Sequence, residues 1–392
     1  MHQVMQITWM NLRSVPQRLA SSLVVCVGIA GVVAVLVSVI AMANGLTETM
    51  LSAGKDNRAI ILRDGALTES LSSISREAAL AIETAPGIRT LADDVLAISP
   101  EVVLAVRFPG YEESAIGAVA VRGLTQRGID LHPEFELTEG RWFDTGKHEL
   151  VAGRMVFEQL GTLQVGDTVS FYNADWRVVG AFSSAGDAHE SEVLADAVMV
   201  MAAARRTVYN AVTVELESPE SFAELETALE GDPRLKVDVQ RESEYYEGQS
   251  QYTSQLLYLV AYVVSSIMAL GALFGALNTM YSAVATRARE IATLRAIGFG
   301  PIPVVVSVLI EALILALIGA LAGVTIAWLL FNGDTFTTTS GGLSQLSVNL
   351  SVGPTLLVSG VIWACAIGFI GGLFPALQAA RRSVVEGLRV IV

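Results

Sequence analysis

Long apolar runs alternate with polar segments along this chain of 392 residues, and four of the runs are long enough to cross a bilayer. A helix needs about 20 apolar residues to span the roughly 30 Å hydrocarbon core, whereas buried core helices usually have about 10–14. The four runs are Leu19 to Ala43, Leu256 to Ala285, Val304 to Phe331 and Val352 to Leu377. The pattern therefore predicts a membrane α-helical protein with four transmembrane helices.

The first run has two features of a secretory signal peptide, because Arg13 and Arg18 precede it and small residues end it at Ala41 to Ala43. The apolar run over 19–43 is nevertheless longer than the core of a signal peptide, which extends over two to four helical turns. We therefore interpret this run as a retained membrane anchor.

Between the first two apolar runs, residues 45–255 change from strand-like to helix-like periodicity and back. Strands are expected at 59–64, 95–108, 115–124, 211–216 and 235–239, with helices at 75–87 and 218–233. Two β-α units lie roughly ninety residues apart, and the stretch between them, about 130–200, is rich in strand and turn residues. We therefore predict an α+β domain with a split βαβ core and a β-rich insertion.

Charge decides which side of the membrane each segment occupies. Residues 45–255 carry 17 Lys and Arg against 35 Asp and Glu. The segment before the first run, the 286–303 loop and the tail after residue 378 each have a net charge of +2. Short basic loops stay in the cytoplasm, so both termini and the 286–303 loop are predicted inside and the α+β domain is predicted to be extracytoplasmic.

The predicted organisation of this multi-pass inner (cytoplasmic) membrane protein therefore has nine parts. They are a cytoplasmic N-terminal segment (1–18), a first span (19–44), an extracytoplasmic domain (45–255), a second span (256–285), a cytoplasmic loop (286–303), a third span (304–331), a short external loop (332–351), a fourth span (352–378) and a cytoplasmic tail (379–392). The second span exceeds the bilayer thickness, so we expect its helix to continue outward as a stalk.

The motifs of common catalytic and metal sites are missing from the sequence. Gly-Lys occurs at 54–55 and 146–147 without the spacing of a phosphate-binding loop, and the four histidines form no HExxH pair. Cys26 and Cys365 both fall within predicted spans and have no metal-ligand spacing. We expect no catalytic residues, no metal site, no directly bound cofactor and no nucleic-acid partner, and we do not expect the chain to be an enzyme on its own.

Two kinds of membrane residue are candidates for packing. Small residues four apart let helices approach closely, and they occur at Gly271/Gly275, Gly319/Gly323 and Gly368/Gly372; the first pair is also a candidate dimer interface. Glu311 lies deep in the third span, where a carboxyl group is costly unless it is paired or protonated. It is interpreted as a hydrogen-bonding group, for example with Asn278, or alternatively as a proton- or substrate-handling group.

The 286–303 loop contains a predicted short helix. Ile291, Leu294 and Ile297 form an apolar stripe on it, charged residues occupy the other faces, and Gly298 is expected to end it. The helix is interpreted either as an interfacial helix on anionic lipid or as a docking helix for a cytoplasmic partner.

Residues 278–300, NTMYSAVATRAREIATLRAIGFG, closely resemble the signature of MacB/FtsX-type ABC permeases. The same family is resembled by IEALILALIGALAG (310–323), by GLFPALQAARRSVVEGLR (372–389) and by VRGLTQRGIDLHPEFELTEGRWF (121–143) with the later GDTVSF and WRVVGAF. One departure is Val384, where the family usually has proline. The resemblance covers nearly the whole chain and includes the relatives LolC and LolE, without a fused ATPase domain.

The resemblance implies a permease that works with a separate ABC ATPase dimer, which binds ATP and Mg²⁺, and with a second permease copy or a paralogue. Closure on the cytoplasmic side would be transmitted to the external domains (a type VII, mechanotransmission cycle). The implied ATPase-coupling residues are Arg287, Arg289, Glu290, Ile291, Leu294, Arg295, Ile297 and Gly298. The candidate packing or dimer residues are Gly271, Gly275, Asn278, Glu311, Gly319 and Gly323.

Two functions are compatible with this resemblance. The first is export or extraction of a hydrophobic or amphipathic substrate, with a periplasmic adaptor and an outer-membrane channel as candidate partners. The alternative is an FtsX-like signalling subunit that activates a periplasmic cell-wall hydrolase. The large external domain favours the first.

Overall fold

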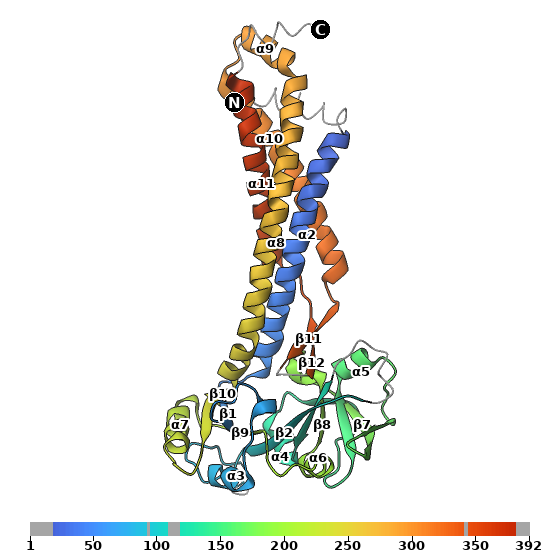
Figure 1. The fold of residues 1–392 in the computed structure, drawn as a ribbon, viewed down its shortest axis with the longest axis vertical. Coiled ribbons are helices and arrows are strands. Elements are labelled where there is room, and N and C mark those ends of the chain that lie inside the picture. The colour runs from blue at the N-terminus through green and yellow to red at the C-terminus, as the bar shows by residue number, and fades with distance from the viewer. Residues whose placement is uncertain (1–18, 92–94, 109–117, 341–343, 382–392) are drawn as a thin grey trace. The chain divides into compact units, whose positions relative to one another are not determined.

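The computed structural model describes residues 19–91, 95–108, 118–340 and 344–381, and Figure 1 shows its fold. The chain forms two compact units. Of the described residues, the membrane unit contains 19–43, 255–334 and 350–381, and the domain unit contains those within 44–254 and 335–349. The tail position Val384 lies outside the described residues.

Four helices in the described part of the chain are long and apolar enough to cross a membrane, which confirms the predicted membrane architecture. They are α2 (Leu19–Ala53), α8 (Glu242–Thr286), α10 (Pro301–Phe331) and α11 (Pro354–Arg381). The helices α2 and α8 extend beyond the spans expected at 19–44 and 256–285, and α8 is an unbroken helix of 45 residues. The second span therefore continues as helix on its N-terminal side, and the outward direction of that continuation stays a prediction.

Small residues bring three of these helices into close contact within the membrane unit. A Cβ atom added to Gly319 would lie 2.8 Å from the carbonyl oxygen of Cys26 on α2, and one added to Gly323 would lie 3.0 Å from the Cα atom of Ala30. A Cβ atom added to Gly368 on α11 would lie 2.5 Å from the Cβ atom of Ala316 on α10. These contacts are the close approaches that small residues permit in membrane helices.

The domain unit is built on one mixed sheet of ten strands. Its strands are β1 (Arg58–Arg63), β2 (Ile98–Val106), β3 (Val119–Leu124), β4 (Glu136–Gly140), β5 (Glu149–Gly153), β6 (Thr168–Phe171), β7 (Ala174–Ser183), β8 (Glu192–Asp196), β9 (Ala211–Glu215) and β10 (Val237–Arg241). The strand order is β10-β1-β9-β2-β3-β8-β5-β7-β4, with β6 paired to β7.

The predicted split βαβ core is confirmed by the first four strands of this order. β1 pairs antiparallel with both β9 and β10, and β2 pairs antiparallel with β9. The helices α3 (Arg76–Ile82) and α7 (Phe222–Glu230) each join two of these strands and share one apolar core with the sheet, which contains Ile82 and Leu225. Ser75 caps α3 by accepting a hydrogen bond from the backbone amide of Ala78.

The insertion between β2 and β9 contains the remaining strands and continues the same sheet. β3 pairs antiparallel with β2 and parallel with β8, so no gap separates the insertion from the core. The short helices α4 (Gln126–Leu131), α5 (Arg154–Leu160) and α6 (Ala197–Ala203) complete it. Trp176 and Phe182 are fully buried there and contribute large apolar side chains to the core of the insertion.

The region expected as a short external loop, 332–351, is in fact a β-hairpin that belongs to the domain unit. Its strands are β11 (Thr335–Ser340) and β12 (Ser344–Asn349), which pair antiparallel. The backbone amide of Gln345 donates to the carbonyl of Ala118 at 2.8 Å, and the amide of Ser347 donates to Ser191 Oγ. The expectation of a short loop was wrong, although the Thr-rich sequence of β11 favours a strand.

Candidate functional site

A short helix, α9 (Ala288–Ala296), follows α8 at the position predicted for a helix in the 286–303 loop. It ends in a Schellman motif, in which the amide of Phe299 donates to the carbonyl of Leu294 and the amide of Gly298 donates to that of Arg295. Gly298 has a φ of +101°, which glycine adopts without strain. The end of α9 is therefore fixed by its sequence.

A buried ion pair joins α10 to the start of α9. Nη1 of Arg287 donates to Oε2 of Glu311 at 2.9 Å, and both side chains are 7% exposed. Both charges are buried, so separating them would leave each one buried without an opposite charge, which is costly in free energy. Asn278, which was expected as a partner of Glu311, is exposed, so that expectation was wrong.

The inner face of α9 packs on its neighbours and its outer face is open. Ala292 is buried, and Ile291 packs on an apolar cluster that α8, α10 and α11 form around Met280, Val308 and Ala376. Leu294 and Ile291 line a small cavity of about 20 Å³ together with the buried ion pair.

The predicted coupling residues divide between these two faces. Arg289, Glu290 and Ile297 are exposed, and Ile297 is 69% exposed although it was expected in the same stripe as Ile291. Arg287 was expected to face a partner and is instead buried. The stripe is therefore broken at its third position, because α9 ends before Ile297 can turn inward.

The two glycines predicted as a candidate dimer interface have open surroundings. No described atom lies within 4 Å of a Cβ atom added to Gly271 or Gly275. Gly319 and Gly323, by contrast, pack on α2. The structure thus brings Glu311 together with Arg287, and it leaves the glycine pair on α8 without a neighbour among the described residues.

A second set of functional candidates, which sequence reasoning missed, is buried in the domain unit. Arg58 on β1 is fully enclosed and its guanidinium contacts four groups: Glu242 at 2.6 Å, Glu134 at 2.6 Å, and the carbonyl oxygens of Leu131 and Ala53 at 2.9 and 3.3 Å. It therefore connects the last turn of α2, the first residue of α8 and the end of α4.

A larger cluster surrounds Arg122 on β3. Its guanidinium donates to Glu69, Glu101 and Glu192, with distances of 2.6–3.0 Å. Burial raises the pKa of Glu69. Arg122 lowers it, but only in part, because the negative charges of Glu192 and Glu101 raise the pKa of Glu69 further. One guanidinium is therefore shared among three carboxylates.

Glu101 behaves differently from Glu69 in the same cluster. Burial alone raises its pKa, but the contacts with His132 and Arg122 outweigh burial and lower the pKa to about 2. Nε2 of His132 lies 3.9 Å from Oε1 of Glu101, which is an electrostatic contact rather than a hydrogen bond. Glu101 therefore stays ionised in the folded domain.

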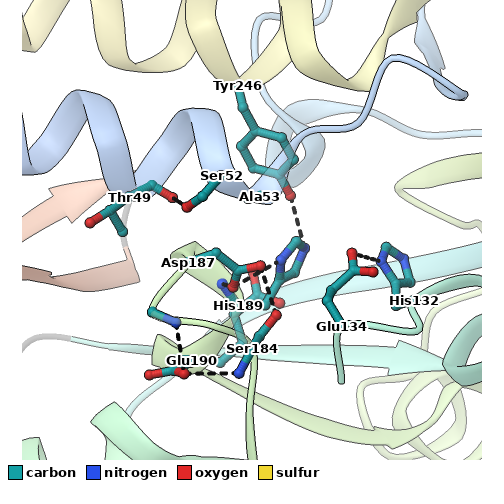
Figure 2. Close-up of polar contacts among 12 residues, drawn as sticks. Thr49, Ser52, Ala53, His132, Glu134, Ser184, Asp187, His189, Glu190 and Tyr246 are labelled. Carbon is teal, nitrogen blue, oxygen red and sulfur yellow. Dashed lines mark hydrogen bonds and ion pairs between the residues drawn. The ribbon is translucent and has the colours of Figure 1, made fainter. Parts of the chain in front are cut away.

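A third network links α8 to the loop before β8, and Figure 2 shows it. Nε2 of His189 lies 3.0 Å from the hydroxyl of Tyr246 on α8, and Nδ1 lies 3.5 Å from Oδ1 of Asp187. Oγ of Ser184 donates to Asp187, and Glu190 accepts two backbone amides nearby. All of these side chains are buried, so the network fixes the first turns of α8 to the loop.

His189 should make the stability of the domain pH-dependent. Burial alone lowers its pKa, but the charge of Asp187 outweighs burial and raises it to about 9. A raised pKa adds stability that is complete below the unfolded value of about 6.5 and is lost as pH rises through 9. We expect the melting temperature of the purified protein, followed by tryptophan fluorescence, to fall by a few degrees between pH 6.5 and 9.

Two variants isolate the contribution of His189 to this pH dependence. His189→Gln should remove most of the fall, whereas His148→Gln should retain it, because His148 lies outside this network. A wild-type pH profile in His189→Gln would contradict the assignment.

No three His, Cys, Asp or Glu side chains in the described part of the chain are arranged to hold a metal ion. The buried polar groups described above are instead paired with one another. Their contacts connect segments that are far apart in the sequence.

Four helices long and apolar enough to cross a membrane, a short helix after the second of them and a large mixed α/β domain inserted after the first define a polytopic membrane protein. Residues 22–231 match the family model of the MacB-like periplasmic core domain, and residues 262–384 match the FtsX-like permease C-terminal model. The chain belongs to the MacB/FtsX-type ABC transporter permease family.

The chain is similar to an uncharacterized ABC transporter permease from Methanocaldococcus jannaschii, with 24% identity over 270 residues. The match covers 65% of this chain and 66% of that relative, so the chain spans just under two thirds of the relative's length. Two solved structures are also similar, each with a TM-score of 0.36.

The first of these structures is the extracellular domain of the noncanonic ABC-type transporter YknZ from Gram-positive bacteria. It is 16% identical, and the match covers 47% of this chain and all of that domain. The second is the periplasmic region of MacB from Actinobacillus actinomycetemcomitans, which is 14% identical; the match covers 54% of this chain and 97% of that region.

Proposed function

We propose that this permease couples ATP hydrolysis by a separate ABC ATPase to movement of its extracytoplasmic domain, and that the movement exports or extracts a hydrophobic or amphipathic substrate. The ATPase subunits bind ATP and Mg²⁺, and the permease itself performs no chemistry. It acts with a second permease copy or a paralogue in the inner membrane, with both termini in the cytoplasm. A periplasmic adaptor and an outer-membrane channel are further proposed partners.

The observation that carries this proposal is the two-sided character of α9. Its outer face offers Arg289, Glu290 and Ile297 to a cytoplasmic partner. Its inner face packs through Ile291 on α8, α10 and α11, and the Arg287–Glu311 pair fixes its start. A force applied to α9 is therefore delivered to several membrane helices at once.

The unbroken length of α8 supports transmission of that force. A helix of 45 residues without an internal proline resists bending at any single point. Its first turns are fixed by Glu242 and Tyr246, both of which are buried in the domain unit. We propose that movement of the cytoplasmic end of α8 displaces the sheet of the domain unit through these buried contacts.

The exposed apolar residue Ile297 provides a direct test of docking at α9. We expect Ile297→Asp to reduce stimulation of the cognate ATPase about tenfold or more, because it places a charge at an apolar contact that the partner must desolvate. The measurement is ATP hydrolysis by the reconstituted ATPase–permease complex.

The matched control is Val198→Asp on α6, which changes an equally apolar side chain that is 56% exposed in the other unit. It should leave stimulation unchanged. Full stimulation by a folded Ile297→Asp protein would exclude docking at this end of α9.

A further inference from the structure

A cleft runs along one face of the sheet in the domain unit. α3 and α7 cover the opposite face, where Val237 and Val239 point, whereas Asp238 alternates with them and lines the cleft. The wider part is a groove of about 610 Å³ between β10, the loop after β1 and the domain-unit turns of α2 and α8. Met50 and Tyr245 belong to its wall.

A narrower chamber of about 60 Å³ adjoins this groove, because Met50, Tyr245 and Gln249 line both. Glu69 and Glu192 of the Arg122 cluster line the chamber, as does Gln345 of the β11–β12 hairpin. The cleft thus has a wide outer part and a small polar inner part.

The outer part has both apolar and polar side chains on its wall. At its rim, Leu67 is 80% exposed and Tyr252 is 78% exposed. Large apolar side chains gathered on a surface often mark a binding site. Nε2 of Gln249 donates to the carbonyl of Leu67 at 2.6 Å, which holds the loop against α8. A ligand with an apolar or aromatic body would therefore find the groove already shaped.

The inner part favours a positive charge. Arg122 is the single cation among the described residues that line it, and three carboxylates already bind this arginine. Burial holds the pKa of Glu69 above its usual range. The side-chain oxygen of Gln345 is buried without a hydrogen-bond partner among the described residues. Asp238 is the one charged side chain among the described residues of the groove, and it is negative.

We propose that this cleft binds an amphipathic primary amine, with its apolar body against Leu67 and Tyr252 and its ammonium group directed toward Glu69 and Gln345. One arginine does not balance three carboxylates, so an ammonium group would supply the missing positive charge. It would also donate a hydrogen bond to the side-chain oxygen of Gln345. The chamber has room for an ammonium group and a few waters, each of which needs at least about 10–15 Å³. This assignment rests on the proposed function and gives the chemistry of its substrate.

Monodansylcadaverine is a suitable probe, because it joins a fluorescent aromatic body to a primary amine through five methylene groups. The matched probe is the same molecule acetylated at that amine, which cannot carry the charge. Each is titrated into the full-length permease in lipid nanodiscs at neutral pH, and the signal of empty nanodiscs is subtracted. We expect saturable binding of the amine and at least tenfold weaker binding of the acetylated probe.

Two substitutions place the binding at the groove. Leu67→Lys should weaken binding of the amine at least tenfold, because it replaces the apolar rim with a like charge. Leu80→Lys on α3 changes a leucine that is 63% exposed on the opposite face, and it should leave binding unchanged. Both positions are exposed, so neither substitution creates a buried charge.

Three results would overturn the proposal: equal affinity for the two probes, a signal no larger than that of empty nanodiscs, or unchanged binding by Leu67→Lys. The groove could instead be covered by a second copy of the chain, and Leu67→Cys tests this alternative. An efficient disulfide between two copies, together with no amine binding, would assign the groove to that copy. Binding is measured without ATP or ATPase. A permease that stimulates its ATPase but binds no amine would therefore disprove the amine assignment and leave the proposed function standing.

Discussion

Arg122→Met is expected to lower the free energy of unfolding of the domain by roughly 3–5 kcal/mol or more, because removal of one partner from a buried ionic cluster leaves charges without compensation. Three carboxylates depend on this guanidinium, two of them less than a tenth exposed. A loss of this size is a large fraction of the roughly 5–15 kcal/mol that stabilises most domains. Thermal unfolding of the purified permease, followed by tryptophan fluorescence, measures it.

The pH dependence of the same variant distinguishes lost charge compensation from lost packing. In the wild-type protein the low pKa of Glu101 adds stability above about pH 4.5 that is lost as pH falls toward 2. In Arg122→Met the unpaired carboxylates prefer to be protonated, so the variant gains stability as pH falls. The difference in melting temperature between the two proteins should therefore narrow on acidification.

Two further variants complete this test. Changing Glu69, Glu101 and Glu192 to Gln in the Arg122→Met background should recover much of the loss, because no buried charge then remains in the cluster. Arg234→Met removes an arginine whose side chain is 80% exposed. That control should leave the melting temperature unchanged, because exposed ion pairs contribute little to stability. A pH-independent difference between wild type and Arg122→Met would show that packing, not charge, is what the arginine provides.

Glu311→Leu should cost the membrane unit about 3–5 kcal/mol, because it leaves the buried guanidinium of Arg287 without its carboxylate. Arg287→Met should cost a similar amount. The double variant Arg287→Met/Glu311→Leu should recover most of either loss, since the two effects are not additive for residues in contact. Thermal unfolding in detergent measures all three, and Arg289→Leu on the exposed face of α9 is the control.

Glu311→Gln separates a structural role from a proton-handling one. The amide oxygen still accepts a hydrogen bond from Arg287, but the side chain no longer titrates. We expect this variant to keep most of the ATPase stimulation and to show no new pH dependence. Loss of stimulation in a stable, well-assembled Glu311→Gln protein would indicate that ionisation of Glu311 is part of the transport cycle.

The membrane helices could be predicted from sequence because their length is imposed by the bilayer and can be counted directly. The split βαβ core was also accessible, since α3 and α7 each have a helical period between strand-like runs. The end of α9 was visible in Gly298, which commonly follows a helix. Each of these features depends on residues that are close together in the sequence.

The buried charges could not be found in the same way. Arg122 is separated from its three carboxylates by 53, 21 and 70 residues, so their meeting depends on strand pairing that periodicity does not specify. Arg287 and Glu311 lie 24 residues apart on two helices, and Asn278 was an equally reasonable partner on the sequence. The β11–β12 hairpin had a signal in Thr335 to Thr339, but the run is short and follows an apolar span.

Arg58 joins two helix ends to the sheet within the domain unit. Its guanidinium holds the last turn of α2 through Ala53 and the first residue of α8 through Glu242, at the point where β1 begins. A slide of one helix past the other by a single turn, about 5.4 Å, would separate Arg58 from Glu242 or from the carbonyl of Ala53. Within the domain unit, Arg58 therefore holds these two helix ends together beside the start of β1.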